Sequence, residues 1–216
     1  MSDTPHISPG KLAYHALVYA KSPRRRYIVG IAGIPGSGKS TLAAQVIENI
    51  PEEIRHVAKL VPMDGFHLTN ARLEELKLRH LKGAPQTFDA AAYIDLLRRA
   101  RDASKHLHFP IYDRNLHEPV LREVSAQELS PDVRIVITEG NYLLLDQEPW
   151  SRLAEILGIC CFVDTPADTA RERIIQRHVR GGRTQASAEE QYERVDLSNS
   201  RLVLEHRRRA DWILNP

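Results

Sequence analysis

The stretch GIPGSGKST, Gly33 to Thr41, determines how the rest of the chain is interpreted. It follows the apolar run YIVGIA, which has the length and composition of a buried strand. It leads into a run in which Leu42, Val46 and Ile50 are four residues apart, the spacing of one helix face. Three glycines, a lysine and three hydroxyl groups are therefore expected where a strand leads into a helix.

This turn matches the pattern G-x-x-x-x-G-K-[ST], in the strand-before, helix-after context that the pattern requires. Glycines let backbone N–H groups converge on phosphate oxygens, and the start of the helix adds its positive end. Lys39 is expected to reach the β- and γ-phosphates, and the Ser40 hydroxyl to ligate Mg²⁺. Motif and context together disfavour the alternative, a glycine-rich turn with an exposed lysine. The predicted nucleotide-binding residues are Gly33, Ile34, Pro35, Gly36, Ser37, Gly38, Lys39, Ser40 and Thr41.

The rest of the chain alternates apolar runs with helical patterns. Runs rich in isoleucine and valine, without polar alternation, predict parallel strands covered on both faces, at 27–33, 58–65, 134–140, 158–164 and 210–215. Helical patterns lie between them, and another, over 11–21, precedes the first strand. Asp89 is the expected N-cap of one helix, and Thr165 that of another with Pro166 in its first turn. The prediction is a single α/β domain over 1–216, three-layered, with a five-stranded, mainly parallel sheet.

Composition and charge restrict the classes of partner. With 216 residues and a net charge of +2, the chain is not expected to offer a large nucleic-acid surface. No apolar run approaches the roughly 18 residues that cross a bilayer, and no signal peptide is recognisable. Cys160 and Cys161 are neighbours on a predicted strand, which makes a disulfide between them improbable. We therefore predict a cytoplasmic protein without membrane or nucleic-acid partners; a homo-oligomer is allowed but not specifically predicted.

Two further predicted strands end in an acidic residue, Asp64 and Glu139. In a parallel sheet both lie at the edge that carries the glycine-rich turn. An acid there can hold Mg²⁺ or accept a proton from an attacking hydroxyl, although an isolated acid after a strand often only begins a turn. We assign Asp64 as the base, because Gly65-Phe66-His67 follows and can shape a pocket, and Glu139 as the magnesium ligand. The residues alone also allow the two roles to be exchanged.

Arginines at helical spacing follow the fourth predicted strand. Arg173, Arg177 and Arg180 share one helix face, and two glycines precede Arg183. Guanidinium groups stabilise the charge on a transferring phosphoryl group, and closure of such a segment excludes water. We therefore predict a helical lid over about 166–186; that Arg173 and Arg177 are its catalytic residues is implied by the family resemblance described below. The alternative is a solvated basic face paired with neighbouring glutamates.

An ordered set of segments resembles the superfamily of uridine kinase, phosphoribulokinase and bacterial pantothenate kinase. The segments are GIPGSGKST, MDGFH, KGAPQTFD, PIYDRNLHEP and ITEGNYLLL, followed by the arginine-rich lid. The first is shared by very many proteins, whereas the ordered set, from about Tyr27 to the C-terminus, is far more specific. Within the superfamily, the chain resembles the nucleoside/nucleotide kinase-like branch that includes fructose transport system kinases. The resemblance implies a P-loop NTPase fold, and transfer of phosphoryl from ATP, with Mg²⁺, to a hydroxyl of a small molecule.

The resemblance also implies residues that contact the acceptor. Asp64 resembles the catalytic aspartate of the uridine kinase segment DxFY, in which His67 takes the place of the tyrosine and Phe66 precedes it. Tyr112 and His117 match the pattern PxYDxxxH, whose aromatic residue and histidine contact the acceptor. Three further matches are implied: Asp89 to the acid that closes the segment before it, Glu139 to the strand-end acid, and Arg173 with Arg177 to the lid arginines. The acceptor-binding insert is expected over about 66–124.

Two alternatives remain at this point. A nucleotide-dependent regulatory ATPase would have the same loop and lid but no small acceptor. The acceptor itself is open among sugars, nucleosides and pantothenate-like molecules, because uridine kinase and pantothenate kinase features coexist. His106 and His108 suggest a metal site, but no third ligand has convincing spacing, so we predict that they are surface residues.

Overall fold

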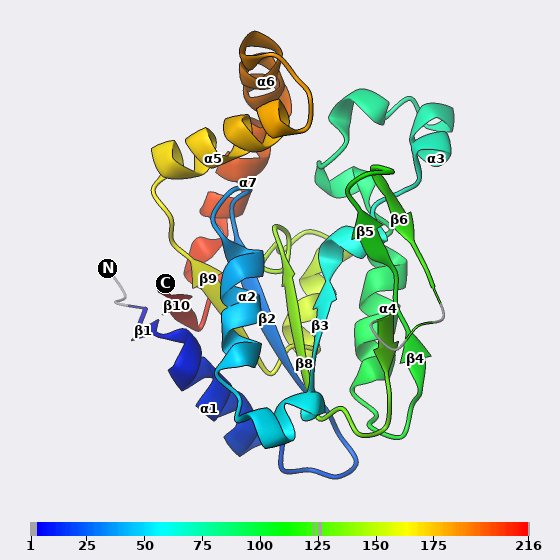
Figure 1. The fold of residues 1–216 in the computed structure, drawn as a ribbon, viewed down its shortest axis with the longest axis vertical. Helices are drawn as coiled ribbons and strands as arrows, with labels where there is room; N and C mark the ends of the chain where they lie inside the picture. The colour runs from blue at the N-terminus through cyan, green and yellow to red at the C-terminus, as the bar shows by residue number, and fades with distance from the viewer. Residues whose placement is uncertain (1–3, 123, 125–126, 216) are drawn as a thin grey trace.

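The computed structural model describes residues 4–122, 124 and 127–215. Within them, the central sheet has six parallel strands in the order β1-β10-β9-β2-β8-β3 (Figure 1). Their bounds are β1 His6–Ile7, β2 Tyr27–Gly33, β3 Ala58–Pro62, β8 Ile135–Gly140, β9 Ile159–Val163 and β10 Trp212–Leu214. The five predicted strands are confirmed, most with shorter ends, and the predicted number of strands is one too low.

The strand that the sequence did not reveal is β1. Only His6 and Ile7 belong to it, too few residues for a periodic pattern. Two backbone hydrogen bonds hold it beside β10, from Ile213 N to Pro5 O at 2.9 Å and from Asn215 N to Ile7 O at 3.0 Å. The start of the described chain therefore extends the sheet at the edge next to its last strand.

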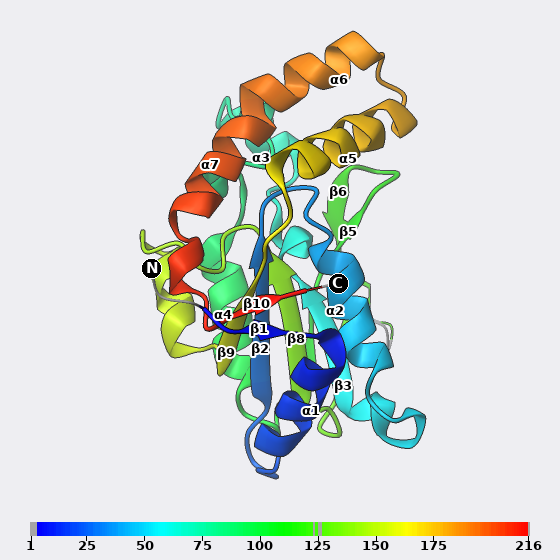
Figure 2. The same ribbon diagram turned by 90° about the vertical axis from the view of Figure 1, so that its left-hand side faces the viewer.

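The sheet is covered on both faces, which is why its central strands lack polar alternation. All of β8 and β9 is buried, and so is β2 after Tyr27. Ile28 and Ala32 of β2 belong to one hydrophobic cluster with helix α4, whereas Val29 and Ile31 belong to another with helices α1 and α2. This alternation produces the predicted three layers, with α1 and α2 on one face and α4 on the other (Figures 1 and 2).

The predicted helices form, with one different cap. Their bounds are α1 Pro9–Tyr19, α2 Lys39–Glu48, α4 Ala90–Ala100 and α5 Ala167–Arg180. Asp89 caps α4 as predicted, since its carboxylate accepts from Ala92 N at 2.9 Å. The predicted cap Thr165 is wrong: Pro166 occupies that position with an extended backbone, and α5 begins one residue later. The hydroxyl of Thr165 instead donates to Ser37 O at 2.8 Å, which links the approach to α5 with the glycine-rich turn.

The remaining elements form two groups above the carboxyl edge of the sheet (Figure 1). One group contains α3 Asn70–Glu75 and the antiparallel hairpin of β5 Ile111–Asp113 and β6 Glu118–Val120. The other contains α5, α6 Gln185–Gln191, the π-helical turn η7 Tyr192–Asp196 and α7 Leu197–Glu205, which leads back to β10. A second antiparallel pair consists of β4 Leu107–His108 and β7 Glu128–Leu129. Short 3₁₀ turns complete the chain: η1 Glu52–Val57, η2 Met63–Phe66, η3 Arg79–Leu81, η4 Pro85–Thr87, η6 Trp150–Glu155 and η8 Arg207–Arg209.

None of the helices in the described residues is both long enough and apolar enough to traverse a bilayer.

Candidate active site

The glycine-rich turn joins β2 to α2 in a shape that requires glycine. Gly36 and Gly38 have φ angles of +76° and +92°, a region that side chains with a Cβ atom rarely adopt. A Cβ atom at Gly36 would lie 2.4 Å from the carbonyl oxygen of Ala170 in α5, so this turn and the lid helix are in close contact. Among the described residues no side chain caps the N-terminus of α2, which leaves the positive end of that helix open to an anion.

Lys39 lies within this turn with its side chain almost fully buried. Its Nζ donates to the carbonyl oxygen of Ile34 at 3.0 Å and to Oδ1 of Asn141 at 2.8 Å. Burial lowers the pKa of Lys39, whereas the carboxylates of Glu139 and Asp64 oppose that shift. The two groups that accept hydrogen bonds from the Lys39 ammonium group are neutral. An anion bound in the turn would therefore form a stronger, charge-assisted hydrogen bond with Lys39.

The two predicted carboxylates lie at neighbouring strand ends. Glu139 is in β8, and Asp64 is in the 3₁₀ turn directly after β3, whose Pro62 pairs with Glu139. The Ser40 hydroxyl donates to Oε1 of Glu139 at 3.1 Å. Burial, reinforced by the charge of Asp64, raises the pKa of Glu139 to about 7. A hydroxyl and two carboxylates at one edge are the hard oxygen donors that suit Mg²⁺.

Ser37 provides a test of whether the turn fits a phosphate group. Its side chain is buried, and its Oγ has no hydrogen-bond partner among the described residues. A buried hydroxyl without a partner is costly. The unpaired Oγ, the open helix end and Lys39 together fit the oxygens of a bound phosphate.

On the other side of Asp64, His67 lies within a cluster of aromatic rings. Its Nδ1 donates to the carbonyl oxygen of Asp64 at 2.8 Å. Its ring centroid is 4.0 Å from that of Phe88 and 4.7 Å from that of Tyr112. Burial lowers the pKa of His67, and the charge of Asp64 opposes this shift. These contacts bring the aromatic side chains of three sequence segments together around His67, next to Asp64.

The segments MDGFH and KGAPQTFD run side by side. The N–H of Asp89 donates to the carbonyl oxygen of Phe66 at 2.7 Å, and a β-bridge joins His67 to Phe88. The Phe66 ring is buried against Tyr93 in the core, with centroids 5.1 Å apart. The Asp89 side chain is occupied as the cap of α4 and is exposed. Of these two predicted acceptor-binding residues, the structure places only Asp89 where a small molecule has access.

Tyr112 and His117 lie on the hairpin of β5 and β6, and Lys82 connects them. The Nζ of Lys82 donates to the carbonyl oxygen of His117 at 2.5 Å and to Oδ1 of Asn70 at 2.6 Å. The same Nζ lies 5.3 Å from the ring centroid of Tyr112. Burial and the charge of Asp64 raise the pKa of Tyr112 to about 12. Tyr112 is partly buried and packs against His67, whereas the His117 side chain is exposed beyond β5.

The lid arginines reach the glycine-rich turn from α5. Nη1 of Arg173 lies 3.6 Å from the position that a Cβ atom at Gly38 would occupy. The positive charge of Arg177 contributes to the lowered pKa of Lys39. Arg180, on the same helix face, and Arg183 are exposed. The structure therefore brings Arg173 and Arg177 close to the predicted phosphate site.

Sequence reasoning missed two polar residues of this site. Asn141, which accepts from Lys39, follows directly after the strand-end motif, and the rule that found Glu139 could have been extended to it. Arg114 lies in the segment PIYDRNLH, and its positive charge opposes the raised pKa values of Glu139 and Tyr112. Arg114 could be recognised only in the folded structure, where the hairpin brings its charge close enough to act on Glu139 of β8.

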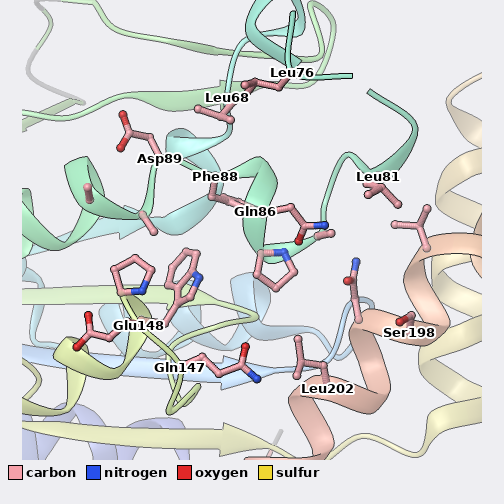
Figure 3. A pocket seen from close by; sticks show the side chains of 18 of the residues that line it. Leu68, Leu76, Leu81, Gln86, Phe88, Asp89, Gln147, Glu148, Ser198 and Leu202 are labelled. Carbon is pink, nitrogen blue, oxygen red and sulfur yellow. The ribbon is translucent and has the colours of Figure 1, made fainter. Parts of the chain in front are cut away.

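A cavity of about 840 Å³ adjoins the aromatic cluster (Figure 3). Its apolar lining residues include Leu68, Leu81, Phe88, Trp150 and Leu202. Phe88 connects the cavity to the strand-end carboxylates, since its ring also contacts His67. The cavity therefore lies between the segment KGAPQTFD and α7, with polar groups such as Asp89 among its lining residues.

Comparison with known proteins gives a consistent result. The model of the phosphoribulokinase/uridine kinase family matches residues 28–215. The chain is 39% identical over 201 residues to the uncharacterized protein YggC of Escherichia coli, covering 92% of this chain and 81% of the relative. It is 33% identical over 220 residues to "putative uridine kinase C227.14" of Schizosaccharomyces pombe, covering 98% and 92%.

Solved structures support the same fold. A "putative fructose transport system kinase" from Silicibacter sp. TM1040 superposes with a TM-score of 0.84 at 31% identity, covering 97% of this chain and all of the other. The P-loop-containing protein YFH7 of Saccharomyces cerevisiae reaches 0.80 at 22% identity, over 97% of this chain and all of the other, and supports the fold alone. The predicted P-loop fold, an α/β structure with a parallel sheet, is confirmed.

Proposed function

This chain belongs to the phosphoribulokinase/uridine kinase family, and from that premise we propose that it transfers the γ-phosphoryl group of ATP to a hydroxyl of a small molecule. The observation that carries the proposal is the meeting of Lys39, Ser40, Glu139 and Asp64 at one sheet edge, beside an aromatic cluster that includes Tyr112. The loop and the lid suit the nucleotide. The aromatic cluster supplies a wall against which a small acceptor can bind.

Different residues of the chain would bind the nucleotide and stabilise the transferring phosphoryl group. The glycine-rich turn and Lys39 would hold the triphosphate, and Arg173 and Arg177 would neutralise charge on the transferring group. Ser40 and Glu139 would hold Mg²⁺, which when bound supplies charge neutralisation to the β- and γ-phosphates. Most of the acceleration in such a site comes from positioning and electrostatic stabilisation.

The neighbours of the two acids support the assignment of their roles. Glu139 accepts a hydrogen bond from Ser40, the residue expected to ligate the metal, so Glu139 is proposed as the metal-linked acid. The charge of Asp64 acts on His67 and Tyr112 of the aromatic cluster as well as on Lys39 and Glu139, so its carboxylate is within reach of both parts of the site. Asp64 is therefore proposed as the base that accepts the proton of the attacking hydroxyl.

Location and partners belong to the same proposal. Both cysteines are buried free thiols, which suits a reducing compartment, and we place the protein in the cytoplasm. Its partners would be ATP and one small acceptor, with no requirement for nucleic acid.

The experiment is a screen of ATP consumption by purified protein with nucleosides, ketoses, pantothenate and glycerate. One acceptor is expected to accelerate ADP release, and Lys39→Ala should nearly abolish that turnover while Lys21→Ala, an exposed lysine, leaves it unchanged. Asp64→Asn should lower kcat more than it weakens ATP binding. A slow ATPase that no acceptor accelerates, combined with nucleotide-dependent binding of a protein, would instead establish a regulatory ATPase.

A further inference from the structure

The pair of short strands β4 and β7 brings together three metal-ligating side chains away from the nucleotide site. His108 belongs to β4, and His106 lies one residue before the start of that strand. In the antiparallel register of β4 and β7, His108 is directly opposite Glu128. The centroids of the two imidazole rings are 5.4 Å apart. Backbone pairing therefore fixes His108 opposite Glu128, and His106 adjoins the same strand.

The third ligand is one that the sequence could not indicate. Glu128 is remote in sequence from both histidines, and only the pairing of β4 with β7 places it beside them. Nε2 of His106 lies 2.6 Å from Oε1 of Glu128. One ligand atom from each residue can be chosen so that all three lie within 4.8 Å of one another. The two histidines are exposed, as predicted, and Glu128 is partly buried.

We propose that His106, His108 and Glu128 form a binding site for a divalent transition-metal ion, of which Zn²⁺ is the probe. Donor atoms of a tetrahedral zinc site are about 3.3 Å apart, given bonds of about 2.0 to 2.1 Å. His106 Nε2 and Glu128 Oε1 are 2.6 Å apart, and donor atoms of all three residues lie within 4.8 Å of one another, so small side-chain rotations can bring them to that spacing. Two imidazoles and one carboxylate are a common zinc set, with water at the fourth position.

The donor chemistry distinguishes this site from the one proposed for magnesium. Imidazole nitrogen favours zinc, copper and nickel, whereas Mg²⁺ and Ca²⁺ prefer oxygen ligands. The two sites have no residue in common. A hydrogen bond between His106 and Glu128 alone would explain their 2.6 Å contact, but it gives no part to His108, whose ring centroid lies 5.4 Å from that of His106.

A metal ion at this position would join the two ends of the stretch that carries the hairpin of β5 and β6. The stretch begins after His108 and ends before Glu128. Gln127, at its end, already links the two ends by hydrogen bonds. The side-chain amide of Gln127 donates to the carbonyl oxygens of Phe109 at 3.1 Å and Val120 at 2.8 Å. The ion would add a second tie at the base of the hairpin that carries Tyr112.

The test is calorimetric titration of the untagged full chain with Zn²⁺, with the variants His106→Ala, His108→Ala and Glu128→Gln. We expect one equivalent bound by the parent, and affinity at least about tenfold weaker in each variant. His206→Ala is the matched control, because His206 forms a pair with the carboxylate of Asp146 at 2.8 Å outside the cluster. It should bind as the parent does, and Mg²⁺ or Ca²⁺ should not compete. The proposal is overturned if the parent binds more weakly than about 1 mM, or if the three variants bind as tightly as the parent.

A spectroscopic measurement separates loss of a ligand from loss of structure. Electron paramagnetic resonance of bound Cu²⁺ should show coupling to two imidazole nitrogens in the parent. One nitrogen should be lost in His106→Ala and in His108→Ala, and none in Glu128→Gln. Two nitrogens that persist in both histidine variants would place the ion elsewhere and refute the site.

Discussion

Replacing Glu139 by glutamine is expected to stabilise the protein without ligands above neutral pH. The Glu139 carboxyl group is buried at the end of β8, and burial together with the charge of Asp64 raises its pKa to about 7. In the unfolded chain the same group has its ordinary value of 4.5. Glutamine resembles the protonated acid in shape and remains neutral at every pH, so it removes the cost of a buried charge.

The sign follows from proton binding in the two states. Between pH 4.5 and about 7 the folded protein retains the Glu139 proton, whereas the unfolded chain loses it. The contribution of this group to stability is therefore fully present below pH 4.5 and is lost as the pH rises through about 7. Each unit of pKa corresponds to about 1.4 kcal/mol, so the loss approaches about 3 kcal/mol. The stability gained by Glu139→Gln should grow by that amount from acid to alkaline pH.

The assay is urea unfolding of both proteins at several pH values between about 5 and 8. The midpoint of Glu139→Gln should separate from that of the parent as the pH rises, with an unchanged slope. Glu53→Gln, at an exposed glutamate, is the control and should show no such trend. Adding Mg²⁺ and nucleotide should shrink the gain, since the ionised carboxylate then acquires a cation. A difference that is constant with pH, or that falls as the pH rises, would refute the reasoning.

Three other perturbations test separate parts of the molecule. Arg173→Ala should lower kcat by a factor on the order of 10³ in the acceptor-stimulated assay, whereas Arg180→Ala, at the C-terminal end of the same helix, should change it little. Gly36→Ala should abolish binding of MgATP in calorimetry, because its Cβ atom would lie 2.4 Å from a carbonyl oxygen of α5. Gly182→Ala has a similar positive φ but open space, so it should cost only about 1 to 2 kcal/mol and leave binding intact. Thr138→Val should lower the unfolding free energy by about 1 to 3 kcal/mol in urea titration, because it leaves the buried Tyr93 hydroxyl without its partner.

Much of the fold could be predicted because its determinants are local in sequence. A strand buried on both faces must be apolar throughout, and the runs that became β2, β8 and β9 have that character. The carboxyl ends of parallel strands share one edge, so the proximity of Asp64 and Glu139 to the glycine-rich turn followed from topology alone. Asp89 was found as a helix cap for the same local reason.

The features that could not be predicted depend on contacts between distant segments. The two residues of β1 carry no pattern and become a strand only because β10 lies beside them. The Thr165 hydroxyl does not cap α5, because it donates a hydrogen bond to the carbonyl oxygen of Ser37, which is distant in sequence. The orientation of His67 depends on rings from two other segments, and Glu128 approaches His106 through strand pairing. Sequence spacing contains no information about such partners.

Burial alone does not separate the roles of the two strand-end acids. Glu139 is enclosed between Ser40 and Lys39, so any charge it carries is balanced by the nucleotide side of the site. Asp64 lies beside His67 and Tyr112, whose titration it alters, and is more accessible than Glu139. A base must meet the acceptor hydroxyl, whereas a metal-linked acid must remain beside the phosphates. Glu139 accepts from Ser40, whereas Asp64 also acts on His67 and Tyr112, which is why Asp64→Asn should affect turnover and Glu139→Gln should affect the response to Mg²⁺.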